Sequence, residues 1–116
     1  MNAYEIPGLR FSMPAGGAVA RHRFVAVDTN GNGIQAIATS NIIGASMNQT
    51  KSGEVLEIAD GIVMVEAAAT IASGVNVSSD KDGKAIAAVT GEGATIVAGI
   101  AITAGVSGGL MAVKIN

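Results

Sequence analysis

Short runs in which apolar and polar side chains alternate recur along the chain, separated by clusters of glycine, asparagine and aspartate. Alternation with a period of two predicts strands that are buried on one face. The Asn-Gly and Asp-Gly pairs between the runs accept the positive φ that tight hairpins require. The runs that fit strands are residues 24–27, 34–38, 42–47, 55–58, 62–66, 75–78, 85–89, 95–102 and 109–115.

This pattern occurs twice in the chain. Residues 19–38 align with residues 71–90 when Gly31 is placed on Gly83, an offset of 83 − 31 = 52. Farther along, Gly44 aligns with Gly99 at an offset of 99 − 44 = 55. The repeat predicts one β-domain over residues 17–116, built from two similar halves at about residues 19–58 and 71–113. Residues 66–73 are a helical candidate, but their short length favours a loop between the halves.

β-branched side chains dominate the apolar composition. The chain has 13 Ile and 12 Val but only 3 Leu, together with 16 Gly. β-branched residues favour pleated, half-buried surfaces, and many glycines indicate many turns. At 116 residues we therefore expect a single all-β domain, either a small β-barrel or a β-sandwich of short strands, because both architectures use the same alternation.

Charge and rare residue types argue against several classes of protein. The chain has no cysteine, which excludes disulfides, thiolate metal sites and a cysteine nucleophile. A net charge of −2 and few aromatic residues do not fit a nucleic-acid-binding face. The first residues lack the basic and apolar regions of a signal peptide. Residues 93–113 are uncharged, but their glycines and alternation favour strands over a membrane-spanning helix. We expect neither a nucleic-acid nor a membrane partner.

The N-terminal segment, residues 1–16, differs from the rest of the chain. It holds both prolines and the alternating apolar residues Leu9, Phe11 and Met13. Proline cannot donate a hydrogen bond to a central ladder, so this segment is predicted to be an edge strand or an extended arm. Two interpretations stay open: the arm covers the core of its own domain, or it seeks a partner.

Two acidic turns resemble the start of a calcium-binding loop. They begin at Asp28 and Asp80, and each contains a glycine three residues later. Neither has the spacing of oxygen donors or the closing glutamate of a complete loop. Asp and Asn side chains often accept hydrogen bonds from their own turn backbone, so hairpin turns are predicted instead. We expect no metal and no cofactor.

His22 is the single histidine, and it lies between Arg21 and Arg23. No serine elbow of the G-x-S-x-G kind accompanies it, so a catalytic triad is not indicated and we expect no enzymatic activity. We interpret these three residues as a surface group on a strand that can contact an acidic neighbour.

Two alternative functions are compatible with a duplicated β-fold. Lipoyl and biotinyl carrier domains present a lysine at an exposed hairpin tip, and Lys81 and Lys84 lie near such a tip. The flanking residues match the carrier motifs only in part. A small ligand-binding β-module would need an exposed aromatic platform, but the chain has no Trp, and Tyr4 and Phe11 both lie in the arm.

The order of motifs resembles that of the tailed-phage capsid cement, or head decoration, proteins. Their typical pattern is a G-x-V strand, a D-x-x-G-K hairpin, an I-G-V/I-A strand, a Gly-Gly or Gly-Glu turn and a final V-x-V/I strand. Segments 74–77, 80–84, 98–102 and 108–115 match this pattern in order. The resemblance covers about Pro14 to the C-terminus, and in the first half Arg23-Phe24 replaces the Gly-Val start.

The resemblance implies a non-enzymatic protein, made in the host cytoplasm, that binds the outer capsid surface of the virion. Such proteins commonly act as a homotrimer and clamp neighbouring subunits of the major capsid protein. We expect the arm to pair with a coat-protein strand or to lie in a groove between coat subunits, with nearby charges setting rate and register. The predicted contacts are Tyr4, Ile6, Leu9, Arg10, Phe11 and Met13 in the arm, and Arg21, His22 and Arg23 beside it.

Overall fold

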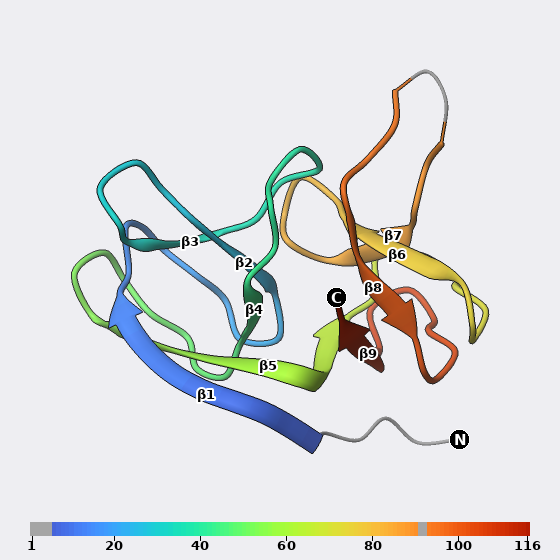
Figure 1. Cartoon of the computed structure of the whole chain (residues 1–116), viewed down its shortest axis with the longest axis horizontal. Helices are drawn as coiled ribbons and strands as arrows, with labels where there is room; N and C mark the ends of the chain where they lie inside the picture. The colour runs from blue at the N-terminus through green and yellow to red at the C-terminus, as the bar shows by residue number, and fades with distance from the viewer. Residues whose placement is uncertain (1–5, 91–92) are drawn as a thin grey trace.

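The computed structural model describes residues 6–90 and 93–116, with only the backbone described at residues 6 and 7. In this part of the chain all regular structure is β, as the sequence predicts, and no helix could cross a membrane (Figure 1). The strands are β1 Ile6–Pro14, β2 Phe24–Val27, β3 Gly33–Gln35, β4 Gly44–Ser46, β5 Val55–Glu66, β6 Asn76–Ser79, β7 Ala85–Ala87, β8 Val97–Ala101 and β9 Leu110–Ile115.

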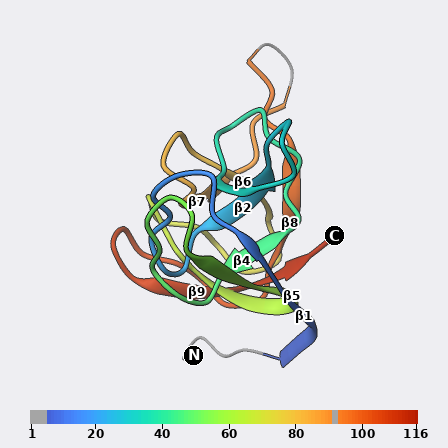
Figure 2. The same cartoon turned by 90° about the vertical axis from the view of Figure 1, so that its left-hand side faces the viewer.

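The strands form one antiparallel sheet that curls on itself. Its order is β3-β2-β4-β5-β9-β8-β6-β7, and β1 pairs with β5 beside this path. In each half an isolated parallel bridge connects the residue after one strand to a later strand: Ala15 after β1 to Gly33 of β3, and Ala67 after β5 to Ala85 of β7. The curl is visible when the molecule is viewed from its end (Figure 2). Each half is therefore a small, barrel-like set of short strands rather than one face of a flat sheet.

Strand β5 runs through a position where the sequence predicts a turn. Asp60 and Gly61 were expected to separate two strands, but the structure keeps them inside one strand. Gly61 has a φ of 104°, and its N–H donates to Asp60 Oδ1 at 2.7 Å. The opposing strand β1 shifts its register between Pro7 and Leu9 at the same place. The glycine therefore bends the strand without ending it, because both sides of the bend keep their partners.

The pairing registers of the two halves are related by the sequence offsets. In β2 and β3, Val25 pairs with Gln35, and 52 residues later Val77 of β6 pairs with Ala87 of β7. The segments of β5 at 55–60 and 62–66 belong to different halves. Segment 55–60 pairs with β1 and β4, whereas segment 62–66 pairs along its length with β9 and meets β1 only at Ile62. We call the strands β1–β4 with segment 55–60 the first half, and segment 62–66 with β6–β9 the second half.

Equivalent positions fill the interiors of the two halves. The first half buries Val19, Val25, Leu56 and Ile58, and Phe11 and Met13 of β1 pack against this cluster. The corresponding positions of the second half are also buried: Ile71, Val77, Met111 and Val113, with Val63 and Val65 of β5. Strand β1 thus covers the first interior in the way that segment 62–66 covers the second.

A second set of apolar side chains fills the space between the halves. Phe24, Ala45 and Ala59 belong to the first half but join the larger cluster that includes Val63, and each is at most 2% exposed. Burying a phenylalanine side chain contributes about 2–3 kcal/mol. The halves are consequently held together by a continuous core as well as by β5.

Polar contacts border this inter-half core. The Glu66 carboxylate accepts from Lys84 at 3.1 Å and from Arg23 at 3.4 Å, so it links the two halves. The Phe24 N–H donates to the Gly83 carbonyl at 2.8 Å. The hydrogen bond from Lys84, followed by the charge of Arg23, holds the pKa of Glu66 below its ordinary value of 4.5, although partial burial acts in the opposite direction.

Two aligned glycines permit close backbone contact. A Cβ at Gly44 would lie 2.5 Å from the Ala59 carbonyl oxygen, and a Cβ at Gly99 would overlap the Lys114 carbonyl oxygen. The two contacts are equivalent: Gly44 lies in β4, which pairs with β5, and Gly99 lies in β8, which pairs with β9. Only glycine allows this approach, because the opposing atoms are backbone and cannot rotate away.

We expect Gly44→Ala and Gly99→Ala each to lower the free energy of unfolding by about 1–3 kcal/mol, because the added methyl group must displace backbone. Urea denaturation with a constant m-value measures the change. Gly17→Ala is the matched control, since nothing lies within 4 Å of its added Cβ. Equal stability of the three variants would contradict the close-contact explanation.

We expect Glu66→Gln to lower stability by about 1 kcal/mol at neutral pH, the upper range for a partly exposed ion pair. The folded-state pKa of Glu66 is depressed, so its contribution is present above the ordinary pKa of 4.5 and is lost as the pH falls through the folded-state value. Denaturation at pH 7 and at acid pH should therefore show the two proteins converging in acid. Glu57→Gln is the control. If the stability difference between Glu66→Gln and wild type were the same at both pH values, the ion-pair explanation would be excluded.

Candidate functional site

The outer edge of β1 is the candidate binding surface. In the described residues β1 forms strand pairs with β5 alone, and Figure 1 shows it along the outside of the molecule. Ser12 lies opposite Glu57 of β5. The Glu57 carbonyl accepts a hydrogen bond from Met47 N–H, so it points away from β1. The Ala15 N–H donates to the Glu54 carbonyl, so the backbone N–H and C=O groups of the odd-numbered residues point towards β5. In an antiparallel ladder the backbone groups of Arg10 and Ser12 therefore point to the open edge.

The side chains of β1 divide between the interior and the surface. Phe11 and Met13 are half-buried against the core of the first half. Leu9 is 58% exposed, and Arg10 and Ser12 are also exposed. Tyr4 lies outside the described residues, and Ile6 is described only as a backbone pair of Ile62. The structure therefore brings the predicted arm residues 9–13 onto one strand but turns Phe11 and Met13 inward.

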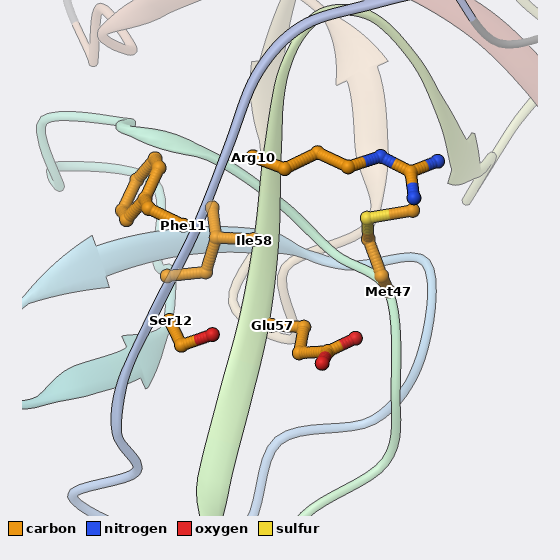
Figure 3. Close-up of a pocket in the computed structure, with 6 residues that line it drawn as sticks. All are labelled: Arg10, Phe11, Ser12, Met47, Glu57 and Ile58. Carbon is orange, nitrogen blue, oxygen red and sulfur yellow. The ribbon is translucent and has the colours of Figure 1, made fainter.

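A shallow pocket lies beside this edge. It has a volume of about 190 Å³ and is lined by Arg10, Phe11, Ser12, Met47, Glu57 and Ile58 (Figure 3). Small-molecule sites usually have about 300–1,000 Å³. Arg10, Met47 and Glu57 lie on one side of β5 and Phe11 on the other. The described residues contain no ion pair of Arg10. The pocket suits a protein side chain better than a separate small ligand.

Sequence reasoning did not single out Ser12, Glu57 and Met47 as neighbours of Arg10. Alternation along β1 is a signal for Ser12, because it lies two residues from Arg10 and hence on the same face. Glu57 and Met47 come from other parts of the chain, and no local pattern specifies which strand pairs with β1. Their closeness to Arg10 follows from the register in which β5 pairs with β1 and β4.

The interpretation of Arg21, His22 and Arg23 as part of a strand is wrong. These residues form the turn before β2, where His22 has a φ of 61° and its N–H donates to the Ser46 carbonyl at 3.0 Å. Gly74 occupies the equivalent position, 52 residues later, with a φ of 83°. A left-handed residue reverses the chain direction and cannot continue a strand. Arg23 pairs with Glu66 of the same chain, while Arg21 is exposed.

The acidic turns form the predicted hairpins. Asp28 Oδ1 accepts from the backbone of Asn30 and Asn32, both at 2.9 Å. Asp80 Oδ1 does the same in the second hairpin, accepting from Asp82 and Lys84. Each carboxylate thus organises its own turn. Across residues 6–90 and 93–116, no three acidic or histidine side chains gather in a metal-binding arrangement.

Of the two lysines considered for a carrier site in the second hairpin, one is held in an ion pair and the other is exposed. Lys84 is bound to Glu66, and Gly83 at the turn is buried against Gln35 and Arg23. Lys81 is exposed. Because the turn is docked on the first half, the hairpin acts as part of the inter-half contact. This geometry does not favour the carrier alternative.

Comparisons with known proteins agree with the all-β architecture. No curated protein matches the sequence. Among solved structures, the chain is similar to the head fiber gp8.5 N base in bacteriophage phi29, with a TM-score of 0.72 over 93% of each chain. The sequences are 21% identical, so this likeness establishes the fold alone.

A family model described as phage cement protein matches residues 5–115, a range that contains every described strand of both halves. The matched residues include all of β1. The chain belongs to the phage cement protein family.

Proposed function

We propose that this protein is a non-enzymatic capsid decoration protein that binds the outer surface of a phage head and bridges neighbouring subunits of the major capsid protein. The observation that carries the proposal is the family match over residues 5–115. The open edge of β1 supports it, because an unpaired edge strand is suited to recognising another protein. The protein is made in the host cytoplasm and joins the head as a homotrimer.

The contact we propose is β-strand addition. The outward backbone groups of Arg10 and Ser12 pair with an extended segment of the coat protein, which supplies affinity. Leu9 and Arg10, whose side chains are both exposed, supply specificity. Tyr4 and Ile6 extend this contact towards the N-terminus. Phe11 and Met13 contribute indirectly, since their packing on the first half holds β1 in place.

Charge gives the contact its orientation. Arg10 and Arg21 are exposed, and together with His22 they favour an acidic coat surface. Arg23 contributes less, because Glu66 already neutralises it. Rim charges mainly affect the association rate and the register of binding. Because the protein binds the assembled shell, many copies stabilise that state by mass action.

Binding to heads tests the proposal directly. Purified protein is mixed with expanded heads of its parent phage that lack it, and the bound fraction is measured by co-sedimentation. Saturable binding to expanded heads, with a higher temperature of head disruption, is expected. Absence of binding to heads at saturating protein would refute the proposed function.

We expect Ser12→Pro to weaken head binding by about tenfold or more, because it removes an outward N–H and places a ring on the edge. The fold should tolerate the change, since proline already occupies Pro14, which has the same orientation. Co-sedimentation gives the affinity, and urea denaturation checks stability. Ser12→Ala is the control; equal binding by the proline and alanine variants would argue against strand addition.

We expect Arg10→Glu to reduce head binding by about tenfold at low salt, with a smaller effect at high salt, because exposed charges are screened. Lys81→Glu makes the same change in charge on the exposed tip of the second hairpin and should bind like wild type. Co-sedimentation at two ionic strengths measures both. If Lys81→Glu loses as much binding as Arg10→Glu, net charge rather than the β1 surface governs the contact.

A further inference from the structure

The second half has an exposed sheet face that nothing in the described chain covers. Asn76, Ile100 and Lys114 are paired side by side across β6, β8 and β9, and all three are exposed. Ile100 is 41% exposed, and neighbouring Val75 and Val97 are each 37% exposed. We call this surface the outer face. It is a mixed apolar and polar strip at the end of the molecule where β6 begins (Figure 1).

The equivalent face of the first half is buried. The offsets of 52 and 55 place Asn76, Ile100 and Lys114 on Phe24, Ala45 and Ala59, which fill the core between the halves. The second half covers these residues. The chain therefore contains one example of what packs on this kind of face: another copy of the same half.

The surface that does the covering can also be located. In the inter-half contact, Gly83 accepts from Phe24 N–H, Glu66 pairs with Arg23, and Ile96 N–H donates to the Ala38 carbonyl. The same offsets carry these three covering residues back onto the first half, where they correspond to Gly31, Pro14 and Asn41.

Gly31, Pro14 and Asn41 are all exposed. We call this group the inner-type surface, and its hairpin turn lies at the opposite end of the molecule from the start of β6 (Figure 1). One chain therefore exposes both sides of its own internal contact, one at each end.

We propose that the outer face of one copy binds the inner-type surface of a second copy, so that copies associate head to tail and repeat the internal contact. This rests on the self-association included in the proposed function, and it names the surfaces. At the position of the Arg23–Glu66 ion pair the contact would join Val75 to Pro14, an apolar pair. Asn76 and Gly31 would take the places of Phe24 and Gly83.

The side chains of the outer face suit a surface that is covered in the assembly and exposed to water in the free protein. Asn76 and Lys114 replace Phe24 and Ala59, so an uncovered outer face stays hydrated, while Val97 and Ile100 keep the apolar character of Ile42 and Ala45. Head-to-tail contacts use two different surfaces and close into a ring when the rotation permits. A ring of three copies would contain six equivalent halves.

Cysteine crosslinking tests the contact, because the natural chain has no cysteine. Asn76→Cys lies on the outer face and Asn30→Cys beside Gly31, and both positions are exposed. When the two single variants are mixed and treated with a short bismaleimide, we expect a two-chain product on a denaturing gel. The double variant should give a closed three-chain product.

Each single variant alone is a matched control, since a head-to-tail contact does not bring two outer faces together. A mixture of Asn76→Cys with Lys81→Cys, on the second hairpin tip, controls for random collision. Crosslinking of Asn76→Cys with itself, or none between Asn76→Cys and Asn30→Cys in solution and on heads, would overturn the proposal.

A substitution provides a second, independent measurement. Ile100→Glu should weaken self-association measured by light scattering by about tenfold or more, because a carboxylate is costly to bury in an apolar contact. Val106→Glu is the control, since Val106 is 64% exposed and lies outside the outer face. Equal self-association of these two variants would count against the outer face.

The result can be separated from the decoration function. Head binding by wild type without crosslinking between Asn76→Cys and Asn30→Cys would refute the head-to-tail contact and leave decoration standing. Crosslinking without head binding would do the reverse. A ladder of products beyond three chains would support the contact but contradict the trimer.

Discussion

Strand β5 is the constraint on which the rest of the structure depends. Its first segment is an inner strand of the first half, paired on both sides, and its second segment opens the second half. Two repeats joined by a flexible linker could move independently, but two repeats that share a strand cannot. The bend at Gly61 lets one strand serve two curled sets of pairs. The inter-half core around Phe24 then follows, because sharing β5 brings the two halves into contact.

Strand β1 and segment 62–66 of β5 occupy equivalent places in the two halves. Segment 62–66 is the first strand of the second half, and it is continuous with the first half. In the first half β1 takes the corresponding place, and in the described residues it forms strand pairs with β5 alone. Its apolar residues Phe11 and Met13 complete the first interior, which leaves Arg10 and Ser12 at the surface. The candidate site is therefore the outer edge of the strand that completes the first interior.

Local patterns predicted much of this fold, and long-range pairing accounts for what they missed. The strand at 24–27 and the turns begun by Asp28 and Asp80 were predicted because alternation and turn chemistry act over a few residues. The continuity of β5 was missed because Asp-Gly is also a turn signal. The left-handed turn at His22 was missed although the offset aligns it with Gly74, a residue suited to positive φ. Nothing local indicates that β1 pairs with β5.

The positions where the two halves differ are the informative ones for function. Positions that fill an interior keep their apolar character in both halves, as at Val25 and Val77, because each interior needs the same filling. Phe24 and Asn76 occupy equivalent positions but differ in character. Phe24 is buried between the halves, whereas Asn76 is exposed on the outer face. A duplicated fold with unequal ends has surfaces that its own partner half does not satisfy. The contacts that we propose with the shell and with other copies use surfaces of this kind, the open edge of β1 and the exposed face of the second half.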